Sequence, residues 1–393
     1  MKVAPRALYL LALVLAAINL RPGITSFAPL IERIATDLSL SRGLVSLVTA
    51  LPVLCMGLLA PFAPRVALRF GLERTISLCL GLILLALLVR FAGQRSVVLI
   101  SSAALLGAGI AIAGPLLSGF IRQHFHGHIG RVVAWYSLSM TIGGASGAVL
   151  TAPAETWLAH GWTWGLAVWS VPALLALLLW ACLPNQSVAP VGDPQPTGLP
   201  WREPRAWLIT AFFAIQAGLF YTLATWLVAR YHQAGLSLLE SNNLFSLLML
   251  VGLPSSFLLP WIAQRRDNRY ELLLGCGLVS LLCLAMITFQ PLLLPQLWAV
   301  LLGMSLSGSF ALSMVLPLYE VDSPLAVSRW TSMMLCAGYS LASLTPVLTG
   351  LGRDLSGNYQ WPFVALTVMA GLLCVFAWRL RAGKPGKGQN FVG

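Results

Sequence analysis

The sequence predicts an all-α membrane protein with twelve transmembrane helices in two pseudo-symmetric halves of six. Hydrophobic residues make up 58% of the 393 residues and charged residues only 9%, and the mean hydropathy is +0.84. A soluble chain of this length could not cover its surface with so few charges. The charged residues are also spaced so that apolar intervals of about 20 residues, the length that crosses a bilayer, separate them.

A helix in lipid must satisfy its own backbone hydrogen bonds, so each long uncharged interval is a candidate span. Eight intervals qualify directly: 43–64, 75–89, 96–121, 132–154, 206–229, 241–264, 330–352 and 355–378. The interval 156–192 holds one more span, at about 163–183, and the interval 272–319 holds two, separated by "QPLLLPQ" at Gln290–Gln296. With a first span at Ala7–Ile31, the total is twelve.

The start of the chain, "MKVAPRALYLLALVLAA", has a basic segment followed by an apolar one, as a signal peptide has. A small-residue cleavage site lies near Ala17, but the apolar run resumes after Arg21 and continues to Ile31. We therefore expect an uncleaved first span. The seven cysteines fall in apolar runs without metal-like spacing. They indicate core residues, so we expect no metal site and no cofactor.

Lysines and arginines are distributed unequally between the two sides of the predicted bundle. With the N-terminus inside, seventeen of the 24 fall on the cytoplasmic side and six on the outer side, and Arg21 remains. The outer six are Arg33, Arg42, Arg90, Arg95, Arg230 and Arg353. This bias predicts a multi-pass protein of the cell inner membrane with both termini in the cytoplasm. Orientation thus explains the net charge of +12, and nucleic acid is not an expected partner.

The segment 184–205, "PNQSVAPVGDPQPTGLPWREPR", is rich in proline and glycine and predicts a cytoplasmic linker. It divides the chain into an N-terminal half at 1–183 and a C-terminal half at 206–381, followed by a tail at 382–393. "WYSLSMTIG" in the fifth span and "WTSMMLCAG" in the eleventh share Trp, Ser and Gly at matching places. Paired six-helix repeats around a central site are typical of transporters.

Four segments carry a family resemblance. They are "LRPGITSFAPL" in the first span, "TALPVLCMGLLAPFAPRVALRFGLERT" across the second, "YSLSMTIGGASGA" in the fifth and "SGNYQWP" before the last. With them the chain resembles major facilitator superfamily transporters, and within these the cyanate permease and 2-nitroimidazole transporter branch. The resemblance implies the major facilitator fold, alternating access and a small anionic or polar heteroaromatic substrate rather than enzymatic activity. We expect a monomer, with a proton as the candidate coupling ion.

The superfamily's loop between helices two and three reads G-x-x-x-D-R-x-G-R-R, and "PRVALRFGLER" departs from it. Arg69 and Gly71 are retained and Arg74 is displaced, while a proline replaces the first glycine and a leucine the aspartate. The resemblance implies a gating role for these three residues, although the positive-inside bias explains the arginines equally well. Gly71 still permits a tight turn. In the second half, "AQRRDNRYE" carries Asp267 as the candidate for an equivalent gate.

Arg21 is the only cation that the predicted spans place near the bilayer centre. All twelve carboxylates fall in loops or at helix ends, so no acid is expected to pair with it. An arginine at a helix centre costs roughly 2.5–3.5 kcal/mol, and its planar donors suit a carboxylate-like or linear anion. Two interpretations follow: a transported anion compensates the charge, or backbone carbonyls freed by the Pro22–Gly23 break do.

Polar and aromatic residues near Arg21 complete the candidate substrate site. Asn19 and Thr25 lie within about one turn of it. The candidates on other spans are Tyr136, with Ser139 and Thr141 beside it, in the fifth span and Gln216, Tyr221 and Trp226 in the seventh. Helix packing or interhelical hydrogen bonding explains each of them as well. The glycine-rich "GGASGA" at Gly143–Ala148 indicates close helix packing, at a place where the two halves would slide.

Three classes of function remain. The first is a secondary transporter whose substrate neutralises Arg21. If its transport is coupled to a proton, the proton would travel on the substrate or through a residue such as Glu320. A uniporter or an exchanger fits the sequence equally well. The second is a multidrug proton antiporter of the same superfamily, which would be expected to carry an acid inside its spans. The third is a membrane-embedded enzyme or sensor, which would need converging catalytic groups or a soluble domain. The first agrees best with the sequence.

Overall fold

The computed structural model describes residues 6–92, 94–125, 129–158, 161–183, 199–321 and 324–382. Across these ranges the chain forms helices and turns without a β-strand. Twelve helical segments are long and apolar enough to cross a membrane. The predicted number of spans is therefore confirmed. The predicted linker and the predicted tail fall mainly outside the described residues.

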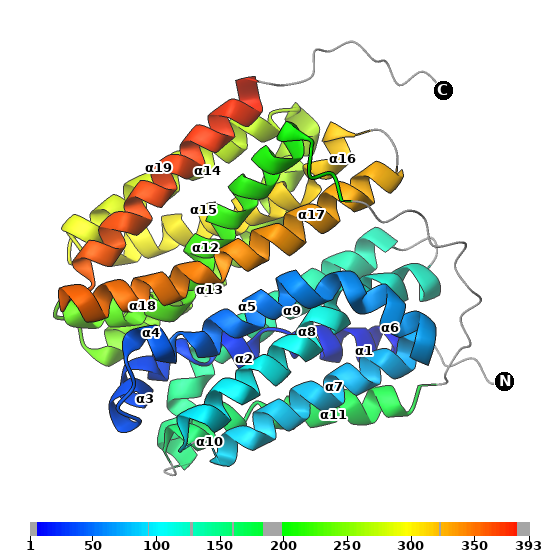
Figure 1. Cartoon of the computed structure of the whole chain (residues 1–393), viewed down its shortest axis with the longest axis horizontal. Coiled ribbons are helices and arrows are strands. Elements are labelled where there is room, and N and C mark those ends of the chain that lie inside the picture. Colours follow the sequence, from blue (N-terminus) through cyan, green and yellow to red (C-terminus); the bar gives the residue numbers. More distant parts are fainter. Residues whose placement is uncertain are drawn as a thin grey trace.

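The first six spans form one bundle, drawn from blue to green in the lower part of Figure 1. Its elements are α1 (Arg6–Ile18), α2 (Pro22–Thr25), η1 (Ala28–Leu30), α3 (Ile31–Asp37), α4 (Arg42–Val45), α5 (Leu47–Leu59), η2 (Ala60–Phe62), α6 (Ala63–Phe70), α7 (Leu72–Val89), η3 (Arg90–Ala92), α8 (Ser96–His124), α9 (Ile129–Leu158), α10 (Trp162–Ala167) and α11 (Ser170–Ala181). Within this bundle, α5 and α7 pack against α8, and α1 packs against α9 and α11. The first span is thus assembled from several short pieces rather than one helix.

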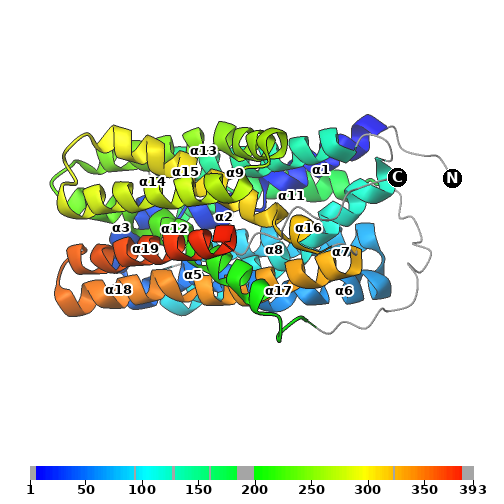
Figure 2. The same cartoon turned by 90° about the horizontal axis from the view of Figure 1, so that it is seen from above.

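The last six spans form the second bundle. Its elements are α12 (Pro204–Gln233), α13 (Leu238–Arg266), α14 (Arg269–Phe289), α15 (Pro295–Val315), α16 (Pro317–Glu320), α17 (Pro324–Ala342), α18 (Leu344–Ser356) and α19 (Gln360–Ala382). In this bundle α13 packs against α15, α14 against α19, and α12 against α17. Figures 1 and 2 show that the long helices of both bundles run along one common direction, as membrane spans do.

Local sequence signals explain several helix ends. Pro204 and Pro295 occupy the first turns of α12 and α15, where the missing N–H of proline costs nothing. Ser237 and Glu240 form a capping box at the start of α13, which satisfies two backbone N–H groups. Gly71, between α6 and α7, has a φ of 86°, a conformation that glycine adopts without strain. The predicted tight turn at Gly71 is therefore present.

The two bundles meet along three helix pairs: α4 with α18, α5 with α17, and α9 with α13. We call the end where α1 begins and α19 finishes the termini end, and the opposite end the far end. Backbones approach closely at the far end, because a Cβ on Gly350 would lie 2.5 Å from the Arg42 carbonyl oxygen. Further along α5, a Cβ on Gly57 would lie 2.8 Å from the Cys336 carbonyl oxygen. The small residues at this seam let the bundles touch.

Candidate functional site

The first span breaks in the middle, between α1 and α2. Pro22 has no N–H to donate, so the Ile18 carbonyl loses its helical partner. The chain closes α1 with short turns instead, in which the Asn19 and Leu20 N–H groups donate to Ala16 and Ala17 at 3.1 and 3.2 Å. Arg21 is the residue immediately before α2, with φ −121°. The break therefore sets the direction in which its side chain leaves the span.

Three glycines of α9 receive this broken segment. A Cβ on Gly143 would overlap the Ile18 carbonyl oxygen, and one on Gly147 would lie 2.9 Å from the Pro22 Cα. Gly144 lies beside Arg21, whose Cδ would be 3.3 Å from a Cβ there. The expected close packing of "GGASGA" is thus present. Its partner is the first span of the same half, so the expectation that this motif lies where the halves slide is corrected.

Arg21 lies among aromatic residues from both halves. Its guanidinium carbon is 5.8 Å from the centre of the Phe220 ring on α12 and 6.0 Å from that of Phe310 on α15. Its charge also acts on three tyrosine hydroxyls, those of Tyr136, Tyr221 and Tyr339 on α9, α12 and α17. The side chain is half-buried. Aromatic faces attract a cation, which lowers the cost of keeping it here.

No acid compensates this cation within the described part of the chain. None of the ion pairs there includes Arg21. Two carbonyls near the break face groups other than Arg21. The Ile18 oxygen faces Gly143, and the Gly23 oxygen accepts a 2.9 Å hydrogen bond from Arg90. Arg21 is thus a half-buried cation whose fork of donors remains available to a ligand.

The sequence-predicted substrate residues separate into two groups. Tyr136 and Tyr221 lie within the electrostatic reach of Arg21. The other four bond to backbone carbonyls of neighbouring helices: Asn19 to Pro172 at 3.0 Å, Thr25 to Gly144 at 2.8 Å, Gln216 to Leu306 at 2.9 Å and Trp226 to Pro346 at 2.9 Å. Asn19 also donates to its own helix, at the Leu15 carbonyl. These four side chains join helices, which is the packing interpretation that the sequence left open.

Sequence reasoning missed the aromatic partners Phe220, Phe310 and Tyr339. A ring on an apolar helix has the same signature whether it faces lipid or a cation, so no signal distinguishes them. It also assigned Arg90 to an outer loop because Arg90 ends an uncharged interval. In the structure Arg90 is 0% exposed, because η3 turns its side chain inward against Gly23 and Ser102. Besides the half-buried Arg21, the described spans therefore contain two buried arginines that the sequence assigned to the outer side, Arg90 and Arg230.

The predicted gating residues lie at the termini end. Arg69 and Arg74 are exposed, and the Arg69 guanidinium lies 5.5 Å from the Phe70 ring. Asp267 ends α13 with a left-handed φ of 48° and pairs with Arg269. None of these three side chains joins the two halves in the ion pairs of the described residues.

Two acidic clusters also lie at the termini end. In the C-terminal half, Arg205 donates to both oxygens of Glu320 at 2.8 and 2.9 Å, and Tyr270 donates to the same carboxylate at 2.6 Å. In the N-terminal half, Glu73 lies 3.6 Å from His124. In these contacts each cluster connects helices of one half. Both oxygens of Glu320 are therefore already hydrogen-bonded. Among the described residues, no group of three or more His, Cys, Asp or Glu side chains could hold a metal ion.

The far end, in contrast, carries polar contacts between the halves. Glu32 on α3 accepts a hydrogen bond from the Tyr359 hydroxyl and a 2.8 Å one from Arg42. The Asp354 carboxylate accepts the Gly43 N–H at 3.0 Å. Burial, together with the neighbouring Glu32 carboxylate, raises the pKa of Tyr359, so its phenol remains a donor. We call these contacts the far-end clasp.

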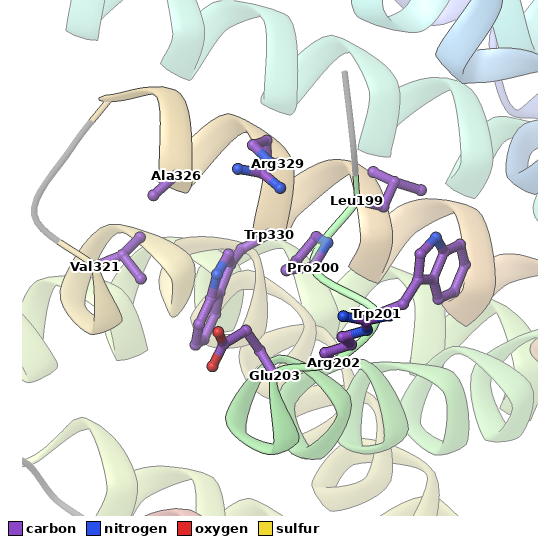
Figure 3. Close-up of a pocket in the computed structure, with 9 residues that line it drawn as sticks. All are labelled: Leu199, Pro200, Trp201, Arg202, Glu203, Val321, Ala326, Arg329 and Trp330. Carbon is purple, nitrogen blue, oxygen red and sulfur yellow. The ribbon is translucent and has the colours of Figure 1, made fainter. Parts of the chain in front are cut away.

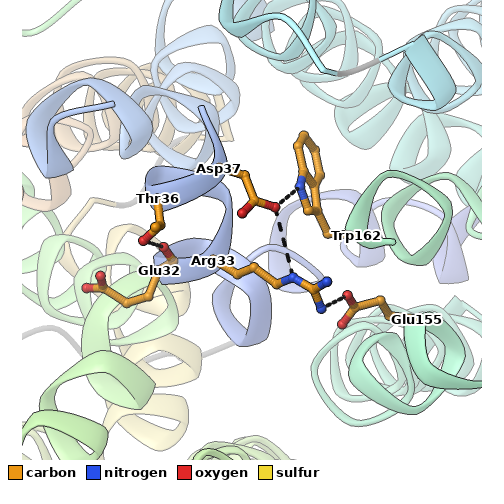
Figure 4. A network of polar contacts seen from close by, with 6 residues as sticks. All are labelled: Glu32, Arg33, Thr36, Asp37, Glu155 and Trp162. Atoms are coloured by element: carbon orange, nitrogen blue, oxygen red, sulfur yellow. Dashed lines mark hydrogen bonds and ion pairs between the residues drawn. The ribbon is translucent and has the colours of Figure 1, made fainter. Parts of the chain in front are cut away.

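A second polar network fixes the N-terminal side of the clasp (Figure 4). Arg33 pairs with Glu155 of α9, and the Trp162 indole N–H donates to Asp37 at 2.9 Å. Glu32 leaves the opposite side of α3 from these contacts. This network holds α3 against α9 and α10, so Glu32 is presented to the other half from a braced helix.

A cavity of about 580 Å³ lies at the termini end of the C-terminal half (Figure 3). The segment before α12 and the start of α17 line it: Leu199, Pro200, Trp201, Arg202, Glu203, Val321, Ala326, Arg329 and Trp330. None of these residues contacts Arg21 or was predicted to bind substrate. The cavity is separate from the candidate site.

Comparisons with known protein sequences agree over nearly the whole chain. The model of the Major Facilitator Superfamily matches residues 13–343. The cyanate transport protein CynX of Escherichia coli (strain K12) is 33% identical over 374 residues, which cover 93% of this chain and 95% of CynX. The 2-nitroimidazole transporter of the same organism is 28% identical over 376 residues, 94% of each chain.

Solved structures show the same fold at lower sequence identity. A bacterial homologue of the human lysosomal transporter Spinster, in an inward-facing and unoccupied conformation, has a TM-score of 0.78 and 17% identity, with 100% of both chains covered. A D-xylose–proton symporter has a TM-score of 0.74 and 14% identity, covering 95% of this chain and 97% of its own. The two-bundle arrangement of twelve spans is common to these proteins.

Proposed function

Because this chain belongs to the Major Facilitator Superfamily and is a multi-pass membrane transporter, we propose that it moves a small anionic or polar heteroaromatic solute by alternating access. Arg21 is the counter-charge of that solute. The relatives named for cyanate and 2-nitroimidazole make these two compounds the first probes. The bias of basic residues supports the inner membrane as its location, with the termini end in the cytoplasm.

The single observation that carries the proposal is the environment of Arg21. A cation inside a membrane protein is retained only where it faces protein, water or a ligand. Arg21 has no carboxylate partner among the described residues, while rings from two helices of the other half lie within about 6 Å. An anion with a flat, polarisable body would bond to the guanidinium fork and contact these rings.

Alternating access follows from the contacts between the halves. The hydrogen bonds to carboxylates that join the halves lie at the far end, whereas the ion pairs given above for the termini end each join groups of one half. We propose that this conformation is closed to the outside and open to the cytoplasm. Opening to the outside would require the far-end clasp to separate. The similar Spinster homologue was captured in an inward-facing state, which supports this direction.

Coupling to a proton has no dedicated carrier in this proposal. Glu320, the sequence candidate near the termini end, is held by Arg205 and Tyr270. A proton would therefore travel on the substrate itself, and uniport or exchange needs none. In that scheme the net charge of the site changes when the substrate binds and leaves, and no side chain gains or loses a proton.

The test is counterflow in proteoliposomes. Vesicles loaded with unlabelled cyanate or 2-nitroimidazole receive labelled probe outside, and transient accumulation above equilibrium reports carrier-mediated exchange. Wild type and Arg95→Gln, which removes an exposed arginine, should accumulate the probe, and Arg21→Gln should not. Equal accumulation by Arg21→Gln would remove Arg21 from the substrate site. Proton-driven export of unrelated cationic drugs without exchange of either probe would favour the multidrug antiporter.

A further inference from the structure

The carbonyl of Gly23 is held by a fully buried arginine from another helix. In a regular helix the Phe27 N–H would donate to Gly23, but here it donates to Ile24 at 3.3 Å. The Gly23 oxygen instead accepts the Arg90 Nη1–H at 2.9 Å. Arg90 follows α7 directly and reaches across to the broken first span. The hydrogen bond therefore ties the break beside Arg21 to the third span.

Burying this arginine is costly, and its partners are only neutral. Arg90 is 0% exposed, and its Nε lies 3.4 Å from the Ser102 hydroxyl. Its Nη2 has no hydrogen-bond partner in the described part of the chain. No described carboxylate forms an ion pair with it. Hydrophobic residues of the same volume would avoid this cost, so stability alone does not account for the choice of arginine.

We propose that Arg90 is a positioning residue for Arg21. By bonding to Gly23, it occupies the carbonyl that would otherwise accept the Phe27 N–H. It thereby anchors α2 and fixes the angle at which Arg21 leaves the break. The α9 glycines pack against the broken segment of the first span on one side, and Arg90 holds the same segment by its hydrogen bond to Gly23. Arg21 is then directed toward Phe220 and Phe310 rather than along its own span. The inference rests on the proposed function of Arg21 as the counter-charge.

The experiment is a double-mutant cycle on purified protein, with binding of cyanate and 2-nitroimidazole measured by calorimetry. Arg90→Met should weaken binding about tenfold, the scale of one hydrogen bond to a charged group. Arg90→Lys, which keeps the charge and one donor, should recover part of the loss. Arg95→Met, which removes an exposed arginine from the same connection between α7 and α8, is the matched control and should bind as wild type does.

Non-additivity separates positioning from general destabilisation. If Arg90 acts through Arg21, the pair Arg21→Lys and Arg90→Met should bind no more weakly than Arg21→Lys alone, because the charge kept in Arg21→Lys leaves binding measurable. Independent, multiplicative losses would overturn the proposal, and so would wild-type binding by Arg90→Met. If Arg90→Met does not fold, the same cycle with Arg90→Lys distinguishes a positioning role from independent effects.

A second readout does not depend on any substrate. Amide hydrogen exchange over residues 24–27 should be faster in Arg90→Met than in wild type or Arg95→Met, because the break has lost its tether. Unchanged exchange there would contradict the role of Arg90 even if binding changed. If Arg21→Gln binds both probes as wild type does, the proposed substrate site fails, while the exchange measurement still decides whether Arg90 holds Gly23.

Discussion

The Tyr359 hydroxyl of the C-terminal half donates a hydrogen bond to the Glu32 carboxylate of the N-terminal half. Tyr359 belongs to the "SGNYQWP" segment between α18 and α19, and its ring lies 5.5 Å from the Trp226 ring. Glu32 lies on α3, which Arg33 and Trp162 help to brace. A donor and an acceptor that are each fixed within their own half meet here, so their separation reports the relative position of the halves.

Removing this hydrogen bond should favour opening at the far end. Tyr359→Phe deletes only the donor, and a loss of about 1 kcal/mol corresponds to about a fivefold increase in the open population. Labelling of Thr49→Cys by a membrane-impermeant maleimide measures the change, in a background whose seven native cysteines are replaced by serine. Thr49 is suited because its hydroxyl lies 2.9 Å from Thr225 of the other half.

Arg33→Gln is the control for this measurement. It removes a pair with Glu155 that lies inside one half and leaves the hydrogen bond between Tyr359 and Glu32 in place, so labelling of Thr49→Cys should rise less than in Tyr359→Phe. Faster labelling in Arg33→Gln than in Tyr359→Phe would show that bracing within the N-terminal half, rather than the clasp, determines closure.

Gly143→Ala should destabilise the protein by roughly 1–3 kcal/mol, the usual cost of overpacking. The new Cβ would overlap the Ile18 carbonyl oxygen and lie 3.1 Å from the Ile18 Cα, and backbone cannot move aside as a side chain can. Gly81→Ala on α7 is matched to it, since nothing lies within 4 Å of a Cβ there. Thermal unfolding in detergent compares the two; equal melting temperatures would mean that the first span tolerates displacement.

Asn19→Ala should lower stability and leave substrate binding unchanged. The substitution removes two hydrogen bonds, to Leu15 and Pro172, worth about 1–2 kcal/mol together. Because both partners are backbone carbonyls away from the ligand, the dissociation constant for cyanate should stay within about twofold of wild type. A tenfold weaker affinity at unchanged stability would return Asn19 to the substrate site.

Phe310→Leu should discriminate between the two probes. The ring lies 6.0 Å from the Arg21 guanidinium and offers a flat face, worth about 0.5–1 kcal/mol to a stacked partner. Affinity for 2-nitroimidazole should fall several-fold, while affinity for cyanate, which has no ring, should change less. Equal losses for both probes would indicate that Phe310 acts on Arg21 rather than on the substrate.

The fold was predictable because lipid imposes a simple rule on the sequence. Charges end most spans, and within the uncharged interval 272–319 the two prolines of "QPLLLPQ" located the break between α14 and α15. Gly71 located the turn before α7. The division of the first span into α1, α2, η1 and α3 was visible only as Pro22 and Gly23. The shape of the broken first span depends on contacts with the α9 glycines and with Arg90, which lie elsewhere in the chain.

Of the candidate substrate site, only its positive charge could be predicted from the sequence. Arg21 was evident as a cation inside an apolar run, and its lack of a described acid partner followed from the positions of the carboxylates. Tyr339 and Phe310 were not evident as neighbours of Arg21, because the sequence of an apolar helix does not distinguish rings that face lipid from rings that face a cation. Arg90 was assigned to a loop because charge usually ends a span; burial against Gly23 is a tertiary contact that no local pattern encodes.

The central claim, that Arg21 is the counter-charge of the transported solute, is tested most directly by ligand-induced thermal stabilisation. Wild type, Arg21→Gln and Arg95→Gln would be heated with cyanate, small carboxylates or 2-nitroimidazole at several pH values. We predict that one class of ligand raises the melting temperature of wild type and Arg95→Gln and has no effect on Arg21→Gln. Equal stabilisation of Arg21→Gln by that ligand would contradict the account.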